Sequence, residues 1–179
     1  MDLIPLVDAL DPRFFVVSAR APHRLGPGFA WYHLADVGSP ESDSFAASLD
    51  ALHRFVEELP RAYPIDPARL CTLGFSQGAV MAGSLLLTQP DLPARTIMLS
   101  GYLPLDQNLP IDEASLANRA VFVAHGTADP LIPIAWARAT RDYFGRTGAA
   151  LTYREYPIAH TIGPEELRDV GNWASGGGV

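Results

Sequence analysis

The hydrophobic pattern of the chain has two forms that alternate along its length. One form is a short, mostly apolar run, which is typical of a strand buried on both faces of a sheet. Such runs lie at residues 14–17, 70–73, 96–100, 121–124 and 151–156. We therefore expect each of these runs to form a strand.

The other form places an apolar side chain at every third or fourth position, which is the spacing of a helix with one buried face. In the first such segment the apolar positions are Phe45, Leu49, Leu52, Val56 and Leu59. Residues 39–41, Ser-Pro-Glu, predict where this helix begins, because serine can cap a helix and both proline and glutamate suit its first turn. Further helices are expected at residues 77–88, 134–144 and 164–173.

Strands that alternate with helices predict an α/β fold, in which helices cover both faces of a mostly parallel sheet. In such sheets the ligand site lies at the carboxyl ends of the strands. Residues 1–175 are expected to form one domain of this kind, and residues 176–179 a flexible tail. Residues 19–38 are rich in Pro and Gly and are interpreted as a loop, whereas residues 1–4 resemble a helix already under way.

The composition suits a single folded domain. The chain has 179 residues, of which 48% are hydrophobic and 18% charged, and this balance excludes disorder. The net charge of −7 and the scattered basic residues argue against a nucleic acid partner. Metal-binding and nucleotide-binding motifs are missing from the sequence, so we expect neither a metal nor a cofactor.

The sequence also indicates where in the cell the protein is expected. No apolar run approaches the roughly 18 residues that cross a bilayer, and acidic residues stand where a signal peptide carries positive charge. Cys71 is the only cysteine, which excludes an internal disulfide, and its apolar neighbours predict a buried strand residue. We therefore expect a cytoplasmic protein with no stable membrane insertion.

A candidate nucleophile follows the second predicted strand. Residues 74–78 read Gly-Phe-Ser-Gln-Gly, a G-x-S-x-G motif between a strand and a helix. The flanking glycines allow a sharp turn that exposes the Ser76 hydroxyl at the start of the helix, where the helix dipole favours a developing anion. The backbone N–H of Gln77 points to the same place. The alternative is a structural Gly-Ser-Gly turn without chemistry.

Two further polar residues follow later strands. Asp129 lies 53 residues after Ser76, and His160 lies 31 residues after Asp129. The order Ser, Asp, His is the order that this sheet architecture uses for a catalytic triad. An aspartate that only forms its own turn, or a solvated loop histidine, is the alternative at each position. His125 precedes Asp129 by four residues and is expected to brace it or to pack in the core.

These segments, together with residues 99–104 (Leu-Ser-Gly-Tyr-Leu-Pro), resemble the phospholipase/carboxylesterase family of α/β-hydrolases, which includes bacterial carboxylesterases and acyl-protein thioesterases. The resemblance implies that Ser76 is the nucleophile, Asp129 the orienting acid and His160 the general base. It also implies that the Gln77 N–H donates to the oxyanion of an acyl ester or thioester substrate. Trp31, Leu103 and Leu131 are candidates for the wall of an acyl pocket, with ordinary core packing as the alternative. A homodimer is expected only from the resemblance.

The sequence departs from the family at its beginning. Members carry early strands and a His-Gly-x-Gly loop, whose backbone supplies a second oxyanion donor, whereas the only His-Gly here is residues 125–126. We therefore expect an N-terminally truncated α/β-hydrolase fold, with a true start upstream or a loss of activity. The leading interpretation is a serine carboxylesterase for short or medium acyl esters. The alternatives are a thioesterase or lysophospholipase of the same family, and a catalytically impaired binding protein.

Overall fold

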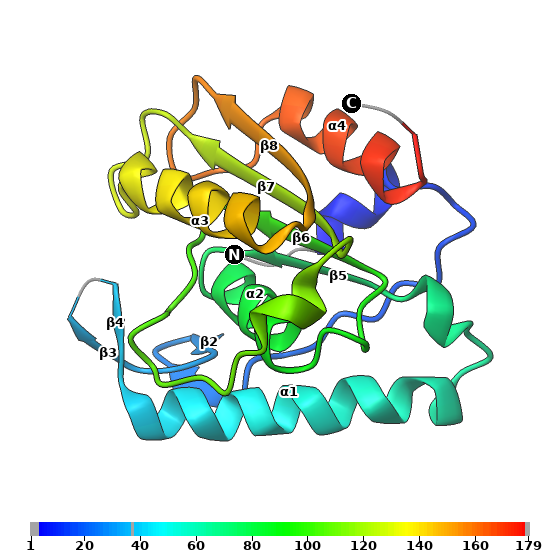
Figure 1. Ribbon diagram of the computed structural model, residues 1–179, viewed down its shortest axis with the longest axis horizontal. Helices are drawn as coiled ribbons and strands as arrows, with labels where there is room; N and C mark the ends of the chain where they lie inside the picture. The colour runs from blue at the N-terminus through cyan, green and yellow to red at the C-terminus, as the bar shows by residue number, and fades with distance from the viewer. Residues whose placement is uncertain (1–3, 37, 178–179) are drawn as a thin grey trace.

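The computed structural model describes residues 4–36 and 38–177. Its centre is a parallel four-stranded sheet whose strands lie side by side in chain order (Figure 1). The strands are β5 (Cys71–Phe75), β6 (Arg95–Leu99), β7 (Ala120–Gly126) and β8 (Ala150–Tyr156). Cys71 begins β5, and burial raises the pKa of its thiol to about 12. The parallel sheet predicted from the apolar runs is confirmed.

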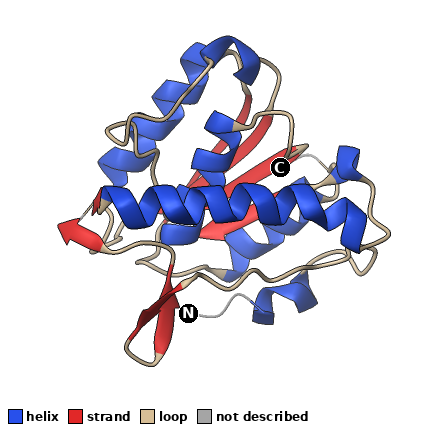
Figure 2. Ribbon diagram, turned by 90° about the horizontal axis from the view of Figure 1, so that it is seen from below, coloured by secondary structure: helices blue, strands red, loops and turns tan. Residues whose placement is uncertain are grey.

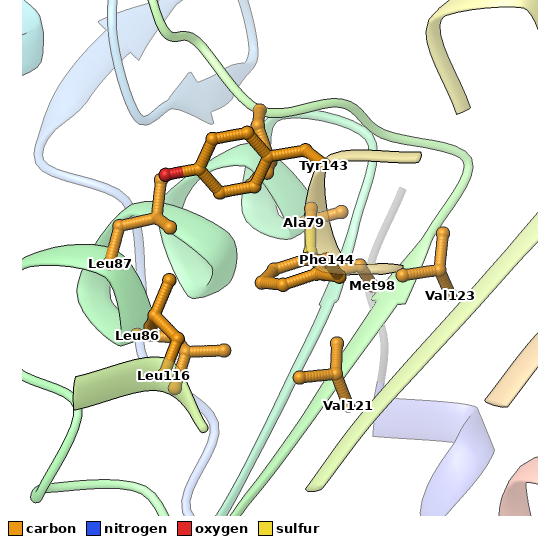
Figure 3. Close-up of a cluster of buried hydrophobic side chains, with 10 residues drawn as sticks. Ala79, Leu86, Leu87, Met98, Leu116, Val121, Val123, Tyr143 and Phe144 are labelled. Atoms are coloured by element: carbon orange, nitrogen blue, oxygen red, sulfur yellow. The ribbon is translucent and has the colours of Figure 1, made fainter. Parts of the chain in front are cut away.

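Successive side chains of the central strands point to opposite faces of the sheet, as the pleat requires. Met98, Val121 and Val123 face one layer, in which they pack with Leu86 and Phe144 (Figure 3). The residues that alternate with these along the strands face the other layer, and they belong to a second apolar cluster that also contains Trp173. The middle strands β6 and β7 are therefore mostly apolar because both of their faces are covered, whereas the edge strand β8 is half-buried and more polar.

Helices supply both covering layers. The helices α2 (Gln77–Thr88) and α3 (Ile134–Thr147) contribute to the first cluster, and α4 (Pro164–Ala174) contributes to the second. The long helix α1 (Ser42–Ala62) packs on α2 and forms an outer layer (Figure 2). Short 3₁₀ helices, η2 (Pro67–Arg69) and η3 (Glu113–Leu116), precede β5 and β7.

The ends of the predicted helices agree closely with the structure. The helix α2 has the predicted bounds, and α3 and α4 extend slightly beyond theirs. The start of α1 differs, because Glu41 rather than Ser39 is the N-cap, and its carboxylate accepts hydrogen bonds from the backbone of Asp43 and Ser44. Ser39 and Pro40 instead form the short strand β4.

The prediction of a strand at residues 14–17 is wrong. This segment is extended but forms no ladder with another strand of the described residues. Its apolar side chains have other partners, since Phe14 packs against the cluster around Trp173 and the ring of Phe15 contacts that of Tyr63. An apolar run alone therefore does not make a strand, because a strand also needs a neighbour for its backbone groups.

The segment interpreted as a loop, residues 19–38, contains three short strands, which belong to two small hairpins. The first consists of β1 (His23–Leu25) and β2 (Gly28–Ala30), and the second of β3 (Leu34–Asp36) and β4 (Ser39–Pro40). Gly26 turns the first hairpin with φ of 55°. The strands are too short to produce a clear alternating pattern in the sequence, which is why the prediction missed them.

The two ends of the chain are only partly described. The helix expected at residues 1–4 lies mostly outside the described residues, and the 3₁₀ helix η1 (Ile4–Ala9) follows directly. The expected tail at residues 176–179 is described only for residues 176 and 177, which lie beyond α4. Among the helices described, none is both long and apolar enough to cross a membrane.

Candidate active site

Ser76 lies in the sharp turn between β5 and α2. Its backbone has φ of 55° and ψ of −121°, a region that costs free energy for any residue with a side chain. The turn is possible because β5 and α2 almost touch: a Cβ atom on Gly74 would lie 2.0 Å from the carbonyl oxygen of Gly78. The Ser76 N–H donates to the Leu99 carbonyl and so fixes the turn to β6.

Three side chains from three strand ends meet at this turn. The Nε2 atom of His160 lies 3.0 Å from the Ser76 Oγ, and its Nδ1 atom lies 2.7 Å from Asp129 Oδ2. The ring of Phe75 packs against the imidazole, with their centroids 4.8 Å apart. The sequence-predicted Ser76, Asp129 and His160, far apart in the chain, are thus joined by hydrogen bonds at the carboxyl ends of the strands.

The partners of His160 determine which of its nitrogens carries the proton. The ionised Asp129 can only accept, so the Nδ1 of His160 donates to it. In the neutral imidazole the Nε2 then has a free lone pair, and this lone pair faces the hydroxyl of Ser76. The arrangement can therefore accept a proton from Ser76.

The carboxylate of Asp129 is buried and accepts hydrogen bonds from three neighbours. Its Oδ1 accepts the backbone N–H groups of Leu131, at 2.8 Å, and of Ile132, at 3.0 Å. Burial by itself would raise the pKa of Asp129, but the hydrogen bonds from Ile132, His160 and Leu131 outweigh it and hold the pKa below its usual value. Asp129 is consequently ionised at neutral pH, although its side chain is not exposed.

Backbone hydrogen bonds tie the loop that carries Asp129 to the loop that carries His160. Beyond the end of β7, the Thr127 N–H donates to the Tyr156 carbonyl, and the Ala128 N–H donates to the Ile158 carbonyl. The contact is so close that a Cβ atom on Gly126 would lie 2.3 Å from the Ile158 oxygen. The distance between the acid and the imidazole is therefore set by an extension of the β7–β8 pairing.

Gln77 connects the serine turn to the loop before α1. Its side-chain amide donates to the Tyr32 carbonyl at 3.1 Å and accepts the Trp31 N–H at 2.9 Å. Its backbone N–H has no acceptor among the residues that the structure describes, as expected at the first position of a helix. This N–H is consequently available to a ligand beside Ser76.

A cavity of about 300 Å³ lies between α3 and the segment that follows β6. Its wall includes Tyr102, Leu103 and Trp136, and the rings of Tyr102 and Trp136 meet edge to face. Gly101, directly before Tyr102, lies close to the Ser76 carbonyl oxygen, since a Cβ atom on it would be 3.3 Å from that oxygen. The lining is mainly apolar and therefore suits a small apolar group.

The three residues predicted to line an acyl pocket lie in different places. Leu103 lines the cavity, Trp31 packs beside the serine turn, and Leu131 lies exposed on the loop that carries Asp129. Sequence reasoning missed Phe75, which supports the imidazole, and Trp136, which lines the cavity. The position of Phe75 inside the G-x-S-x-G motif could have indicated the first, but nothing in the sequence indicated the second.

Glu166 is a buried carboxyl group behind the loop of His160. It lies in the first turn of α4 and its side chain is fully buried. Its Oε2 accepts the Gly163 N–H at 3.2 Å, whereas its Oε1 has no partner in the part of the chain that the structure describes. Burial raises the pKa of Glu166 to about 7, although the hydrogen bond from Gly163 opposes the shift.

This group should make the folded protein lose stability as the pH rises. The folded protein binds the Glu166 proton more tightly than the unfolded chain, so the stabilisation is complete below the ordinary glutamate pKa and is lost as the pH rises through about 7. Relative to Glu166→Gln, the wild type should lose about 3 kcal/mol of unfolding free energy between pH 4.5 and 8. Urea unfolding at several pH values measures this difference. Glu165→Gln, at the exposed neighbouring position, is the control, and parallel pH curves for wild type and Glu166→Gln would contradict the prediction.

Among the residues that the structure describes, no group of three or more His, Cys, Asp or Glu side chains could hold a metal ion. The groups that meet at the site are a hydroxyl, an imidazole, a carboxylate and the backbone N–H of Gln77.

The sequence matches known proteins over most of its length. Residues 14–175 match the sequence model of the phospholipase/carboxylesterase family. Acyl-protein thioesterase 1 of Debaryomyces hansenii is 28% identical over 151 residues, which make up 80% of this chain and 65% of that protein. Acyl-protein thioesterase 1 of Candida albicans is 25% identical over 169 residues, or 87% of this chain and 73% of that protein. The chain thus spans about two thirds of the length of these relatives.

Solved structures have the same fold. The carboxylesterase of Mesorhizobium loti superimposes with a TM-score of 0.87 at 26% identity, over 97% of this chain and 81% of that chain. The carboxylesterase of Bacillus cereus gives the same TM-score and coverage at 21% identity. With a family match across nearly all of its residues and these structural neighbours, the chain has the α/β-hydrolase fold and belongs to the phospholipase/carboxylesterase family.

Proposed function

We propose that this protein is a serine hydrolase that cleaves short or medium acyl esters through an acyl-serine intermediate. The observation that carries the proposal is the hydrogen-bonded series from Ser76 through His160 to Asp129. The similarity to acyl-protein thioesterases and carboxylesterases supports ester or thioester cleavage as the class of reaction.

In the first half of the reaction, the Ser76 Oγ attacks the acyl carbon while the Nε2 of His160 takes the hydroxyl proton. The buried, ionised Asp129 stabilises the imidazolium that forms and keeps its ring in place. The carbonyl oxygen gains negative charge in this step, and the free N–H of Gln77 at the positive end of α2 is placed to donate to it.

In the second half, the imidazolium returns its proton to the leaving alcohol or thiol, and the acyl group remains on Ser76. Water then enters, and its oxygen attacks the acyl carbon while His160 takes one of its protons. The bond between the acyl carbon and the Ser76 Oγ breaks, the imidazolium returns its proton to Oγ, and the carboxylic acid is released. The same groups serve an ester and a thioester, because only the leaving atom differs. A thioesterase is therefore the second candidate, favoured by the similarity to acyl-protein thioesterases.

The cavity between α3 and the segment after β6 is proposed to hold the acyl chain. Its volume of about 300 Å³ lies at the lower end of the range for ligand pockets, which favours short acyl groups over long ones. Ala139 lines the cavity from α3, where its side chain also reaches the solvent. A larger side chain at this position should fill the cavity at little cost to folding.

The test is a series of p-nitrophenyl esters and matched acyl thioesters of increasing acyl length. We expect kcat/KM to fall once the acyl chain outgrows the cavity, and we expect Ala139→Leu to move this limit to shorter chains. The matched control is Ala135→Leu, which changes an exposed residue one turn earlier in α3 that does not line the cavity. An acyl preference that is the same in all three proteins would exclude this cavity as the acyl site.

Labelling with a fluorophosphonate probe tests the reaction class separately, since the probe phosphonylates an activated serine. Wild type should become labelled at Ser76. If neither any ester nor the probe reacts with the wild type, the chain is a binding protein with a hydrolase fold, and the proposed function is wrong.

A further inference from the structure

A second imidazole lies beside Asp129, next to the same carboxylate oxygen, Oδ2, that His160 contacts. His125 lies next to the end of β7, its side chain is fully buried, and it points to the same face of the sheet as Val121 and Val123. Its Nε2 atom lies 2.9 Å from the Ile132 carbonyl oxygen and 3.3 Å from Asp129 Oδ2. The triad chemistry does not use this residue.

We infer that His125 is a positioning residue that closes the loop of Asp129 and thereby fixes the carboxylate for His160. The inference rests on the proposed function, because it concerns the same carboxylate. His125 itself does not touch the substrate, and it acts on His160 only through Asp129 and the loop at residues 129–132.

The tautomer of His125 follows from its surroundings. The Ile132 carbonyl can only accept, so Nε2 of His125 carries a proton and donates it. The Nδ1 atom is buried and has no partner among the described residues. A proton on Nδ1 would be a buried donor without an acceptor, which is costly, whereas a bare lone pair there is tolerated better. The ring is thus held as the neutral tautomer with its N–H directed at the loop.

The His125 N–H fixes the loop at Ile132, which is also a residue whose own N–H binds the Asp129 carboxylate. The Ile132 carbonyl accepts from His125, while the N–H of the same residue donates to Asp129 Oδ1. With Ile132 fixed at both ends of its backbone, Oδ1 is occupied and Oδ2 is directed to His160. Releasing the Ile132 carbonyl would let the carboxylate turn away from the imidazole that it orients.

The alternative is that His125 only fills space in the core. The two interpretations differ in what happens when Asp129 is changed. If His125 acts through the carboxylate, its replacement matters only while the carboxylate is present, because residues that act as a unit are not additive. If it only packs, its replacement has the same effect in either background.

The experiment compares His125→Leu and His125→Gln, each alone and combined with Asp129→Asn. We expect His125→Leu to lower kcat by about 10- to 100-fold with little change in KM, since a displacement of the order of 1 Å has such effects. His125→Gln should recover most of the activity, because its amide can donate to the Ile132 carbonyl. In the Asp129→Asn background His125→Leu should change the rate of fluorophosphonate labelling by less than about twofold.

Three results would overturn the inference: full activity of His125→Leu, an equal loss in both backgrounds, or no recovery by His125→Gln. Thr96→Val controls for the loss of a buried polar group, since Thr96 is fully buried on β6 and touches neither Asp129 nor its loop. Its kcat should stay within about twofold of the wild type.

Proton NMR keeps this test independent of the proposed function. The Nδ1 proton of His160, shared with Asp129, should give a low-field signal in the wild type and in His125→Gln, and a broadened or absent signal in His125→Leu. If the wild type neither hydrolyses esters nor reacts with the probe, the proposed function fails, and this signal alone decides the inference: an unchanged signal in folded His125→Leu overturns it.

Discussion

Replacing Ser76 with alanine is expected to lower kcat for every accepted acyl ester by about 10⁶, with little effect on KM. The reason is that the proposed reaction needs a covalent bond to the Ser76 Oγ, and no other hydroxyl group is hydrogen-bonded to His160 among the described residues. Some acceleration over water should persist, because the Gln77 N–H still stabilises the oxyanion of a water-driven attack. Initial rates with a p-nitrophenyl ester and mass spectrometry of probe-treated protein measure both effects.

A second serine of the same helix provides the control. Ser84 is fully buried in α2 and donates to the Val80 carbonyl, so Ser84→Ala removes a similar hydroxyl from the core without touching the triad. Its kcat should match that of the wild type. If Ser76→Ala kept more than about a hundredth of the wild-type kcat, the acyl-serine mechanism would be wrong.

Asp129→Asn is expected to lower kcat by about 10⁴, the second largest effect. Two backbone N–H groups, from Leu131 and Ile132, require an acceptor at the position of Oδ1, so the asparagine oxygen must lie there. Its NH₂ group then faces His160 and donates to Nδ1, which moves the imidazole proton to Nε2. An imidazole with Nε2 protonated cannot accept the proton of Ser76.

The loss should therefore be chemical rather than structural. The midpoint of urea unfolding for Asp129→Asn should fall only slightly, while kcat falls by orders of magnitude. Asp142→Asn, an exposed position in α3, is the control and should keep the wild-type rate. A loss of less than about tenfold in kcat for Asp129→Asn would mean that the carboxylate does not set the tautomer.

The sequence predicted the central sheet well because its strands have a simple physical signature. The strands β6 and β7 are buried along nearly their whole length, so their residues are mostly apolar, and a helix with its own periodicity follows each of β5, β7 and β8. The same regularity identified Ser76, Asp129 and His160, since each lies shortly after a strand and the carboxyl ends of parallel strands meet at one edge.

The segments outside the central sheet were harder to predict, because their structure depends on which residues they contact rather than on a hydrophobic pattern. The run at residues 14–17 is apolar enough for a strand, yet Phe14 and Phe15 find their contacts in side chains and not in a ladder. The contact between the loops that carry Asp129 and His160 depends on backbone atoms of Thr127 and Ala128, which any residue type supplies. The sequence could place His125 near Asp129 but could not choose between bracing and packing.

The order of the strands has a consequence for how the protein matures. Because each strand of the central sheet pairs with the next one in the chain, the sheet can grow in the direction of synthesis. The turn with Ser76 can form as soon as β5 and β6 have paired, but His160 arrives only with β8, the last strand. In the proposed mechanism Ser76 is activated by His160, so we expect labelling of Ser76 only after β8 has paired with β7. The moment at which Ser76 becomes reactive would then report the last step of folding, rather than the first collapse of the core.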